Sequence, residues 1–439
     1  MKAMSFMSNA SLLAVALVAA DVRAADAAPG PKFEFHGFVV ASTYLQNQTF
    51  LTGQGSGILI AAPTPGNELP IPGSATSKSG TFLGADVRQT RFILALTGNP
   101  AWGGATPKAH LEFDLFGNTN AGALGYEAPN PRIRQAYGEL KWGNTTFDVG
   151  QHSANILLAQ IPASMAHITN PVPYGAGLLG WRTIGFRLVH AIPMDAMKVE
   201  LGAEIAHGKW ADSSGATVFP GNAPNAISLA WAANTPQLVG RVKVDGKSGN
   251  LSWMGWVGGM WESINLKGFG DSVAPNGVTL QDGSVKKDIT SYALTAGGNI
   301  TFQPVVLMFQ AYTGQATAPL AGSMLQFGEM ADIGYWAQLG FFATKQVSLW
   351  GIFGGSSIDK KDLQNWANPA GNNLTVANTT LRKDNTMFGG MLRYMDGGYG
   401  LGAEYYTYST KYLLGNIAND GGTKSTSAYQ FLVSGGYFF

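Results

Sequence analysis

The residues of this chain that could act on a solute are charged side chains at polar positions of segments that alternate between polar and apolar residues. Guanidinium groups bind carboxylates through paired hydrogen bonds, and carboxylates bind cations or neutralise neighbouring arginines. Alternate residues of a strand point to one face, so this spacing predicts that the charges share a face. The residues concerned are Arg91, Glu112, Asp114, Arg132, Arg134, Asp148 and Arg187.

Strands are the elements that would position these charges. In 109–116, apolar side chains alternate with His110, Glu112 and Asp114. The C-terminal segment has an apolar or small residue at every second position, a pattern that predicts a strand with one apolar face. The alternating residues of this terminal strand are Tyr429, Phe431, Val433, Gly435, Tyr437 and Phe439.

The connections between the alternating segments are short and long in turn. About sixteen such segments, joined in this way, are typical of an up-and-down barrel with tight turns at one rim and long loops at the other. The short connections are expected at 99–104, 143–144, 191–196, 245–249, 302–304, 344–346 and 395–398, and the long ones at 46–80, 119–130, 151–179, 211–235, 265–288, 314–326, 359–381 and 412–423.

The composition is that of a protein that crosses a membrane with strands. Apolar residues make up 45% of the chain and charged residues 13%. Beyond the N-terminal segment, however, no uncharged apolar run reaches the roughly 18 residues that a spanning helix needs. Without such helices, only a closed barrel satisfies its backbone groups in lipid. The predicted fold class is therefore all-β, a transmembrane antiparallel up-and-down β-barrel.

The arginines of the shared face have two interpretations. They line a pore and guide anionic or carboxylated solutes, or they pair with lumen carboxylates and brace the wall. We favour the pore-lining interpretation and expect a preference for anions. Because Glu112, Asp114 and Asp148 face the same lumen, we expect pairing to reduce that preference.

The histidines also have two interpretations. An imidazole titrates near neutral pH, so His152 and His167 are candidate pH sensors. We favour ordinary hydrogen bonding in a polar loop for both residues. The six histidines lack the spacing of zinc ligands, and the chain has no cysteine for a thiolate site or a disulfide. We expect neither a metal nor a cofactor.

Catalysis and nucleic-acid binding have little support in the sequence. No Gly-x-Ser-x-Gly motif occurs, and a catalytic site needs a nucleophile, a base and an orienting group in mutual reach. A net charge of +1 gives no bulk attraction to nucleic acid. We expect no enzymatic activity and no catalytic residues, with an outer-membrane hydrolase as the disfavoured alternative.

The N-terminus has the features of a secretory signal. Lys2 precedes a ten-residue apolar stretch at 11–20, and small residues that suit cleavage follow. We therefore expect 1–27 to be a signal peptide and 28–439 to form one barrel domain.

The segment 87–151 resembles the second to fifth strands of trimeric outer-membrane porins, and most closely their phosphate-selective and DcaP-like branches. The resemblance rests on Arg132-Ile-Arg-Gln-Ala-Tyr137 and on Val149-Gly-Gln151. It implies a bacterial outer-membrane homotrimer, surrounded by lipid and lipopolysaccharide, that passes small hydrophilic solutes. It also implies that the loop after the fifth strand, 151–179, folds inward and narrows the pore.

Residues near that loop support more detailed expectations. Gln135 falls on the outward parity and fits a subunit contact. Ala136, Gly138 and Gly150 fall on the inward parity and would make room for the loop. Residues 151–180 carry no charge, so a basic wall would face a neutral loop.

The later strands carry aromatic residues on the inner parity. These are candidates for a track for sugars or aromatic solutes, but we favour packing near the rims. They are Tyr312, Trp336, Trp350 and Tyr406.

The function predicted from these features is passive diffusion through an arginine-lined constriction. One alternative is a channel specific for small carboxylated or aromatic solutes. Another is a structural barrel that encloses a partner.

Overall fold

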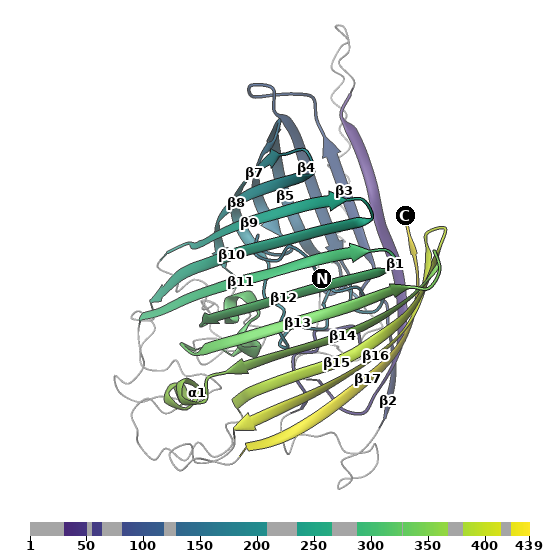
Figure 1. The fold of residues 1–439 in the computed structure, drawn as a ribbon, viewed down its shortest axis with the longest axis vertical. Coiled ribbons are helices and arrows are strands. Elements are labelled where there is room, and N and C mark those ends of the chain that lie inside the picture. Colours follow the sequence, from purple (N-terminus) through teal and green to yellow (C-terminus); the bar gives the residue numbers. More distant parts are fainter. Residues whose placement is uncertain are drawn as a thin grey trace, which may run out of the picture.

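The structure is a computed structural model that describes residues 30–50, 55–63, 81–117, 129–208, 235–265, 288–326, 328–367, 381–413 and 423–439. The predicted signal peptide lies outside the described residues. The described strands form one antiparallel sheet whose members follow one another in chain order around the molecule (Figure 1).

The sheet closes on itself. β1 pairs with β17 at one side and with β2 and β3 at the other. β2 and β3 pair with opposite ends of β1 and make one wall strand with a break at 87–90, so the seventeen segments form a sixteen-strand barrel, as predicted. The strands are β1 (Lys32–Gln46), β2 (Phe82–Asp86), β3 (Arg91–Thr97), β4 (Thr106–Asp114), β5 (Arg132–Trp142), β6 (Thr145–His152), β7 (Thr183–Pro193), β8 (Met197–Gly208), β9 (Gln237–Ser248), β10 (Leu251–Asn265), β11 (Asp288–Phe302), β12 (Val305–Gln315), β13 (Ala331–Phe342), β14 (Val347–Ile358), β15 (Leu381–Asp396), β16 (Tyr399–Leu413) and β17 (Thr423–Phe438).

The connections follow the predicted alternation. Each predicted short connection coincides with a tight turn, such as the two residues between β5 and β6. The helix α1 (Lys360–Ala367) follows β14 at the opposite end of the barrel (Figure 1). No helix among the described residues is long and apolar enough to cross a membrane.

Side chains of the wall alternate between outside and lumen. On β17, Phe431 and Val433 are 40% and 48% exposed, whereas Gln430 and Leu432 are fully buried. Exposed aromatic rings lie toward both ends of the strands, as in the girdles that border an apolar membrane band. They are Trp261, Tyr292 and Tyr335 toward the long connections and Phe302, Phe341, Tyr394, Tyr399 and Tyr437 toward the short turns.

Three segments from the long-connection end lie against the inward face of the wall: 55–63, 153–182 and 316–326. Ala62 N donates to Thr410 Oγ1 on β16 over 2.9 Å, and Gly180 N donates to Leu320 O over 2.8 Å. The third segment contains two short 3₁₀ turns, η8 (Ala318–Leu320) and η9 (Ser323–Leu325). The segments therefore contact the wall and each other inside the barrel.

Apolar packing fills the lumen on the side of β13–β17. Leu59, Ile60, Tyr174 and Met324 from the three segments share one core with inward residues of these strands. The predicted aromatic residues are inward and more than nine-tenths buried, so the packing interpretation is correct, although these side chains pack inside the lumen. They are Tyr312, Trp336, Trp350 and Tyr406. On the side of β4–β9, by contrast, the inward wall carries paired charges such as Arg134, Arg187 and Glu204.

Candidate functional site

The break between β2 and β3 turns two side chains toward the inward segments. Asp86, the last residue of β2, and Arg88, within the break, pair over 2.6 Å in a buried position. Gln89 donates from Nε2 to Ser56 O over 2.8 Å and accepts from Thr169 N over 2.6 Å. The interruption thereby ties the first two inward segments to the wall.

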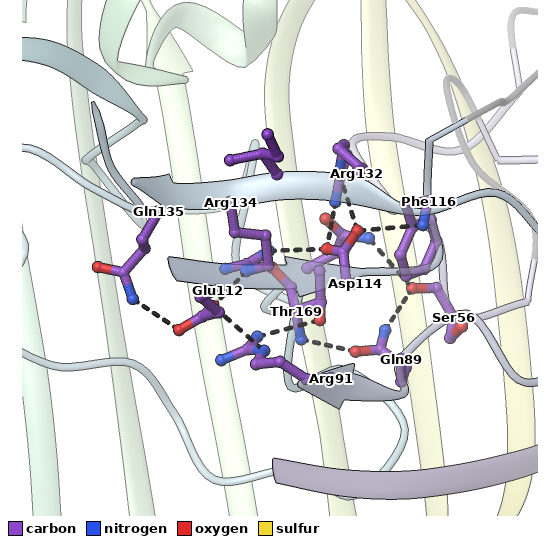
Figure 2. Close-up of polar contacts among 12 residues, drawn as sticks. Ser56, Gln89, Arg91, Glu112, Asp114, Phe116, Arg132, Arg134, Gln135 and Thr169 are labelled. Carbon is purple, nitrogen blue, oxygen red and sulfur yellow. Dashed lines mark hydrogen bonds and ion pairs between the residues drawn. The ribbon is translucent and has the colours of Figure 1, made fainter. Parts of the chain in front are cut away.

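Five charged residues of β3, β4 and β5 form what we call the arginine cluster: Arg91, Glu112, Asp114, Arg132 and Arg134. Arg134 donates from Nε to Glu112 over 2.7 Å and from Nη1 to Asp114 over 3.2 Å. Arg132 pairs with Asp114 over 2.6 Å, and Arg91 pairs with Glu112 over 3.3 Å. Figure 2 shows both carboxylates lying between the three guanidinium groups.

The arginine cluster also holds the segment 153–182. Arg91 donates to Thr169 Oγ1 over 3.0 Å, and Arg134 donates to Thr169 O over 3.4 Å (Figure 2). Glu112, Asp114 and Arg134 are all more than nine-tenths buried. The arginines are thus paired, as the second interpretation of them described, and two of them fasten the segment to the wall.

Gln135 faces the lumen, so its predicted outward position is wrong. A β-bulge at Arg134 shifts the register, and Gln135 lies opposite the inward Glu112. Its Nε2 donates to Glu112 over 2.6 Å. The same shift places Ala136 and Gly138 opposite outward residues of β4, so both face outward and their predicted inward position is wrong. Gly150 faces inward, as predicted.

Two further arginines hold the start of the segment 153–182. Arg187 on β7 pairs with Glu204 over 2.9 Å and donates to Ala154 O over 2.9 Å. Arg241 on β9 pairs with Glu200 and donates to Ile156 O over 2.7 Å. Each guanidinium joins a wall carboxylate to a backbone carbonyl of the segment.

The middle of this segment is anchored on the opposite wall. Glu404 on β16 accepts hydrogen bonds from Met165 N and Ala166 N, both over 2.7 Å, and from Ser164 Oγ over 2.6 Å. His167 Nε2 lies 3.0 Å from Gln430 Oε1, and burial lowers the pKa of this imidazole. His167 therefore makes the hydrogen bond that we expected, whereas that interpretation is wrong for His152, because His152 ends strand β6 and its Nε2 has no partner.

A polar cavity of about 330 Å³ lies between the start of this segment and the wall strands β5–β9. We call it the lumen pocket. Asp148 and His152 contribute from β6, and Asn155 from the segment. His152 stacks on Tyr137 with ring centroids 4.5 Å apart. The remaining polar lining is Gln135, Thr146, Ser153, Arg187, Glu200 and Arg241.

Several polar atoms of the lumen pocket have no partner. Asp148 Oδ1, His152 Nε2 and both polar side-chain atoms of Asn155 are buried without a hydrogen bond. Asp148 forms no ion pair with any described residue, because Arg187, its cross-strand neighbour, is paired with Glu204. The lumen pocket therefore differs from the arginine cluster, where every carboxylate is paired.

Comparisons with known proteins bear on the fold. No family model matches this chain, and no curated protein sequence matches it. Solved structures do match. The outer-membrane channel DcaP of Acinetobacter baumannii aligns with a TM-score of 0.59 at 14% identity, over 93% of this chain and 98% of DcaP. This chain has the porin fold.

Two other solved structures agree on that porin fold. An anion-selective porin from Comamonas acidovorans aligns with a TM-score of 0.51 at 12% identity, over 93% of this chain and all of that one. A loop-deletion variant of Vibrio cholerae OmpT aligns with a TM-score of 0.52 at 11% identity, over the same shares. The structural alignments establish the shared barrel. Identities this low carry no information about the solute.

Sequence reasoning missed Arg182, the residue just before β7. Its guanidinium lies 5.6 Å above the Trp181 ring and has no ion pair among the described residues. Burial, and then the nearby Arg132 and Arg134, lower its pKa to about 9, so it stays charged at neutral pH. Its position at the end of an uncharged loop, directly before a strand, was the available signal.

No metal site is evident in the part of the chain that the structure describes, because no three His, Asp or Glu side chains come together there. The nine predicted site residues instead divide among three places. Arg91, Glu112, Asp114, Arg132 and Arg134 form the arginine cluster, Asp148, His152 and Arg187 lie at the lumen pocket, and His167 is buried against β17.

Proposed function

We propose that this chain is a bacterial outer-membrane channel through which small hydrophilic solutes diffuse passively. The observation that carries the proposal is a closed sixteen-strand barrel with an apolar outside and a charged inner wall on one side. Barrels of this strand number enclose an aqueous channel. Diffusion through such a channel needs no energy coupling.

The path that we propose runs along the polar side of the lumen, between the segment 153–182 and β4–β9. The opposite side is filled by the apolar core, so the usable width is smaller than that of an empty barrel. Selection by size follows from this narrowing. Selection by charge is set by the net fixed charge where the path passes the arginine cluster.

We also propose a preference for anions. The arginine cluster and the neighbouring Arg182 together carry four guanidinium groups against the two carboxylates Glu112 and Asp114. Fixed charge acts more strongly in a narrow, low-dielectric lumen than in bulk water. The structural similarity to an anion-selective porin is consistent with a preference for anions.

The experiment is the reversal potential of the purified chain in a planar bilayer under a KCl gradient. Wild type is expected to conduct with chloride preferred over potassium, and Arg182→Gln is expected to reduce that preference because it removes the unpaired charge. Lys345→Gln, a change in a turn at the rim, is the matched control. Absence of conductance would overturn the channel, whereas potassium preference would overturn only the anion proposal.

The predicted homotrimer remains a proposal. Gln135 no longer supports it, because its side chain faces the lumen. The outward faces of β1, β3 and β4 are apolar and suit either lipid or a second subunit. Light scattering of the detergent-solubilised chain measures the mass directly, and a monomer mass would overturn the trimer.

A further inference from the structure

We propose that the lumen pocket binds a small solute by its ammonium group, with Asp148 as the main contact. This inference concerns which solutes the proposed channel holds, and it stands on observations separate from those that support anion preference. It starts from a buried carboxylate that the protein itself leaves unpaired.

Asp148 is 7% exposed and forms no ion pair with a described residue. Burial of an unpaired carboxylate costs free energy, and chains normally place a cation beside it. Here the nearest wall cation, Arg187, points to Glu204 and to the carbonyl of Ala154. The carboxylate is therefore available to a cation that enters from outside the chain.

The neighbouring strand adds a second carboxylate. Glu139 on β5 lies directly opposite Asp148, and it also lacks an ion pair among the described residues. Like charges directly opposite one another across a ladder repel. The row that runs from β4 to β8 holds Lys108, Glu139, Asp148, Arg187 and Glu204, which is three carboxylates against two cations. A bound cation would neutralise the excess.

The remaining unpartnered atoms fit the polar groups of an organic solute better than a bare metal ion. Asn155 is 1% exposed, and both its amide nitrogen and its amide oxygen lack partners. His152, held by its stack on Tyr137, has an unpartnered Nε2. These atoms can donate to and accept from a small polar molecule whose ammonium group contacts Asp148.

The cavity has a size that suits such a molecule. A volume of about 330 Å³ holds a solute of a few carbon atoms together with some water. The ammonium group offers three donors, which suit the Asp148 carboxylate and the Asn155 amide oxygen in the cavity lining. We therefore expect short aliphatic amines to bind.

Isothermal titration calorimetry of the full chain in detergent tests this inference without requiring conduction. The probes are the four-carbon diamine putrescine, butanediol as its uncharged analogue and succinate as its anionic analogue. We expect saturable binding of putrescine, and we expect Asp148→Asn to weaken it at least about tenfold, as loss of one hydrogen bond to a charged group implies. Glu139→Gln should weaken it less.

Asp245→Asn is the matched control, because Asp245 is a lumen carboxylate that pairs with Lys198 and Lys243. Its putrescine affinity should equal that of wild type. No binding of putrescine to wild type, equal affinity in Asp148→Asn, or butanediol binding of the same strength would each overturn the inference. A chain that conducts without binding putrescine contradicts this inference alone, and one that binds putrescine without conducting contradicts only the proposed channel.

Discussion

The arginine cluster and the lumen pocket lie on the same stretch of barrel wall, and they treat their charges in opposite ways. In the arginine cluster, Glu112 and Asp114 each contact two guanidinium groups. In the lumen pocket, Asp148 contacts none, although Arg187 is its cross-strand neighbour. Charges that satisfy each other hold the structure together, and a charge left unsatisfied is available to a solute.

The contrast between the arginine cluster and the lumen pocket predicts the largest loss of unfolding free energy for Glu112→Gln. This change leaves Arg91 and Arg134 buried without that carboxylate, and breaking a buried pair typically costs about 3 kcal/mol or more. Urea unfolding of the chain refolded into lipid vesicles measures the loss. Asp245→Asn, whose pairs are more exposed, should cost less than about 1 kcal/mol. A loss of similar size in both variants would mean that the pairs of the arginine cluster do not brace the wall.

Glu404→Gln should have the next largest effect. The amide cannot accept as strongly from Ser164, Met165 and Ala166, and a hydrogen bond to a charged group contributes about 1.5–3 kcal/mol. We expect lower unfolding free energy and higher single-channel conductance, because the segment 153–182 loses one of its anchors on β16, leaving the bond from Tyr408 to Val172 O. Glu262→Gln, at a buried carboxylate with a single hydrogen bond from Gln237, is the control. Unchanged conductance in Glu404→Gln would argue that this segment does not limit the passage.

Asp148→Asn should change stability in the direction opposite to Glu112→Gln. It removes a buried charge that has no partner, so unfolding free energy should rise by about 1 kcal/mol in the same urea experiment. A loss of stability would show that Asp148 is paired in the folded protein, and it would remove the contrast between the two regions.

The smallest expected effect concerns His167. Burial lowers the pKa of its imidazole from an ordinary value of 6.5, so the unfolded chain binds the proton more readily. The stabilisation is complete above about pH 6.5 and falls as the pH drops below that value. His167→Gln should flatten the decline between pH 7 and pH 5, measured by urea unfolding. Glu404 and Asp86 lie near enough to reduce the effect.

Most of the barrel could be predicted from the sequence, because strand alternation and turn length are local properties. The inward parity of Glu112, Asp114 and Arg187 followed from spacing alone. The inward position of Gln135 could not be predicted in this way. The bulge at Arg134 depends on pairing with β4, and the alternation of polar and apolar residues does not indicate it. A shift of one residue moves every following side chain to the other face.

The packed half of the lumen was also missed. The apolar stretch 58–62 stands inside a long connection that was expected at the outer rim, and its composition was the available signal. Which charges pair could not be predicted either. Arg187 lies between Asp148 and Glu204, and only the folded structure shows that it contacts Glu204.

The contrast between the arginine cluster and the lumen pocket is tested most directly by chemical modification at position 148 in the conducting channel. The chain has no cysteine, so Asp148→Cys provides a unique thiol, and wild type is the unreactive control. We expect a positively charged methanethiosulfonate reagent to reduce the current through Asp148→Cys and to leave the wild-type current unchanged. Complete modification of the thiol with no change in current would contradict the central claim that the lumen pocket lies on the solute path.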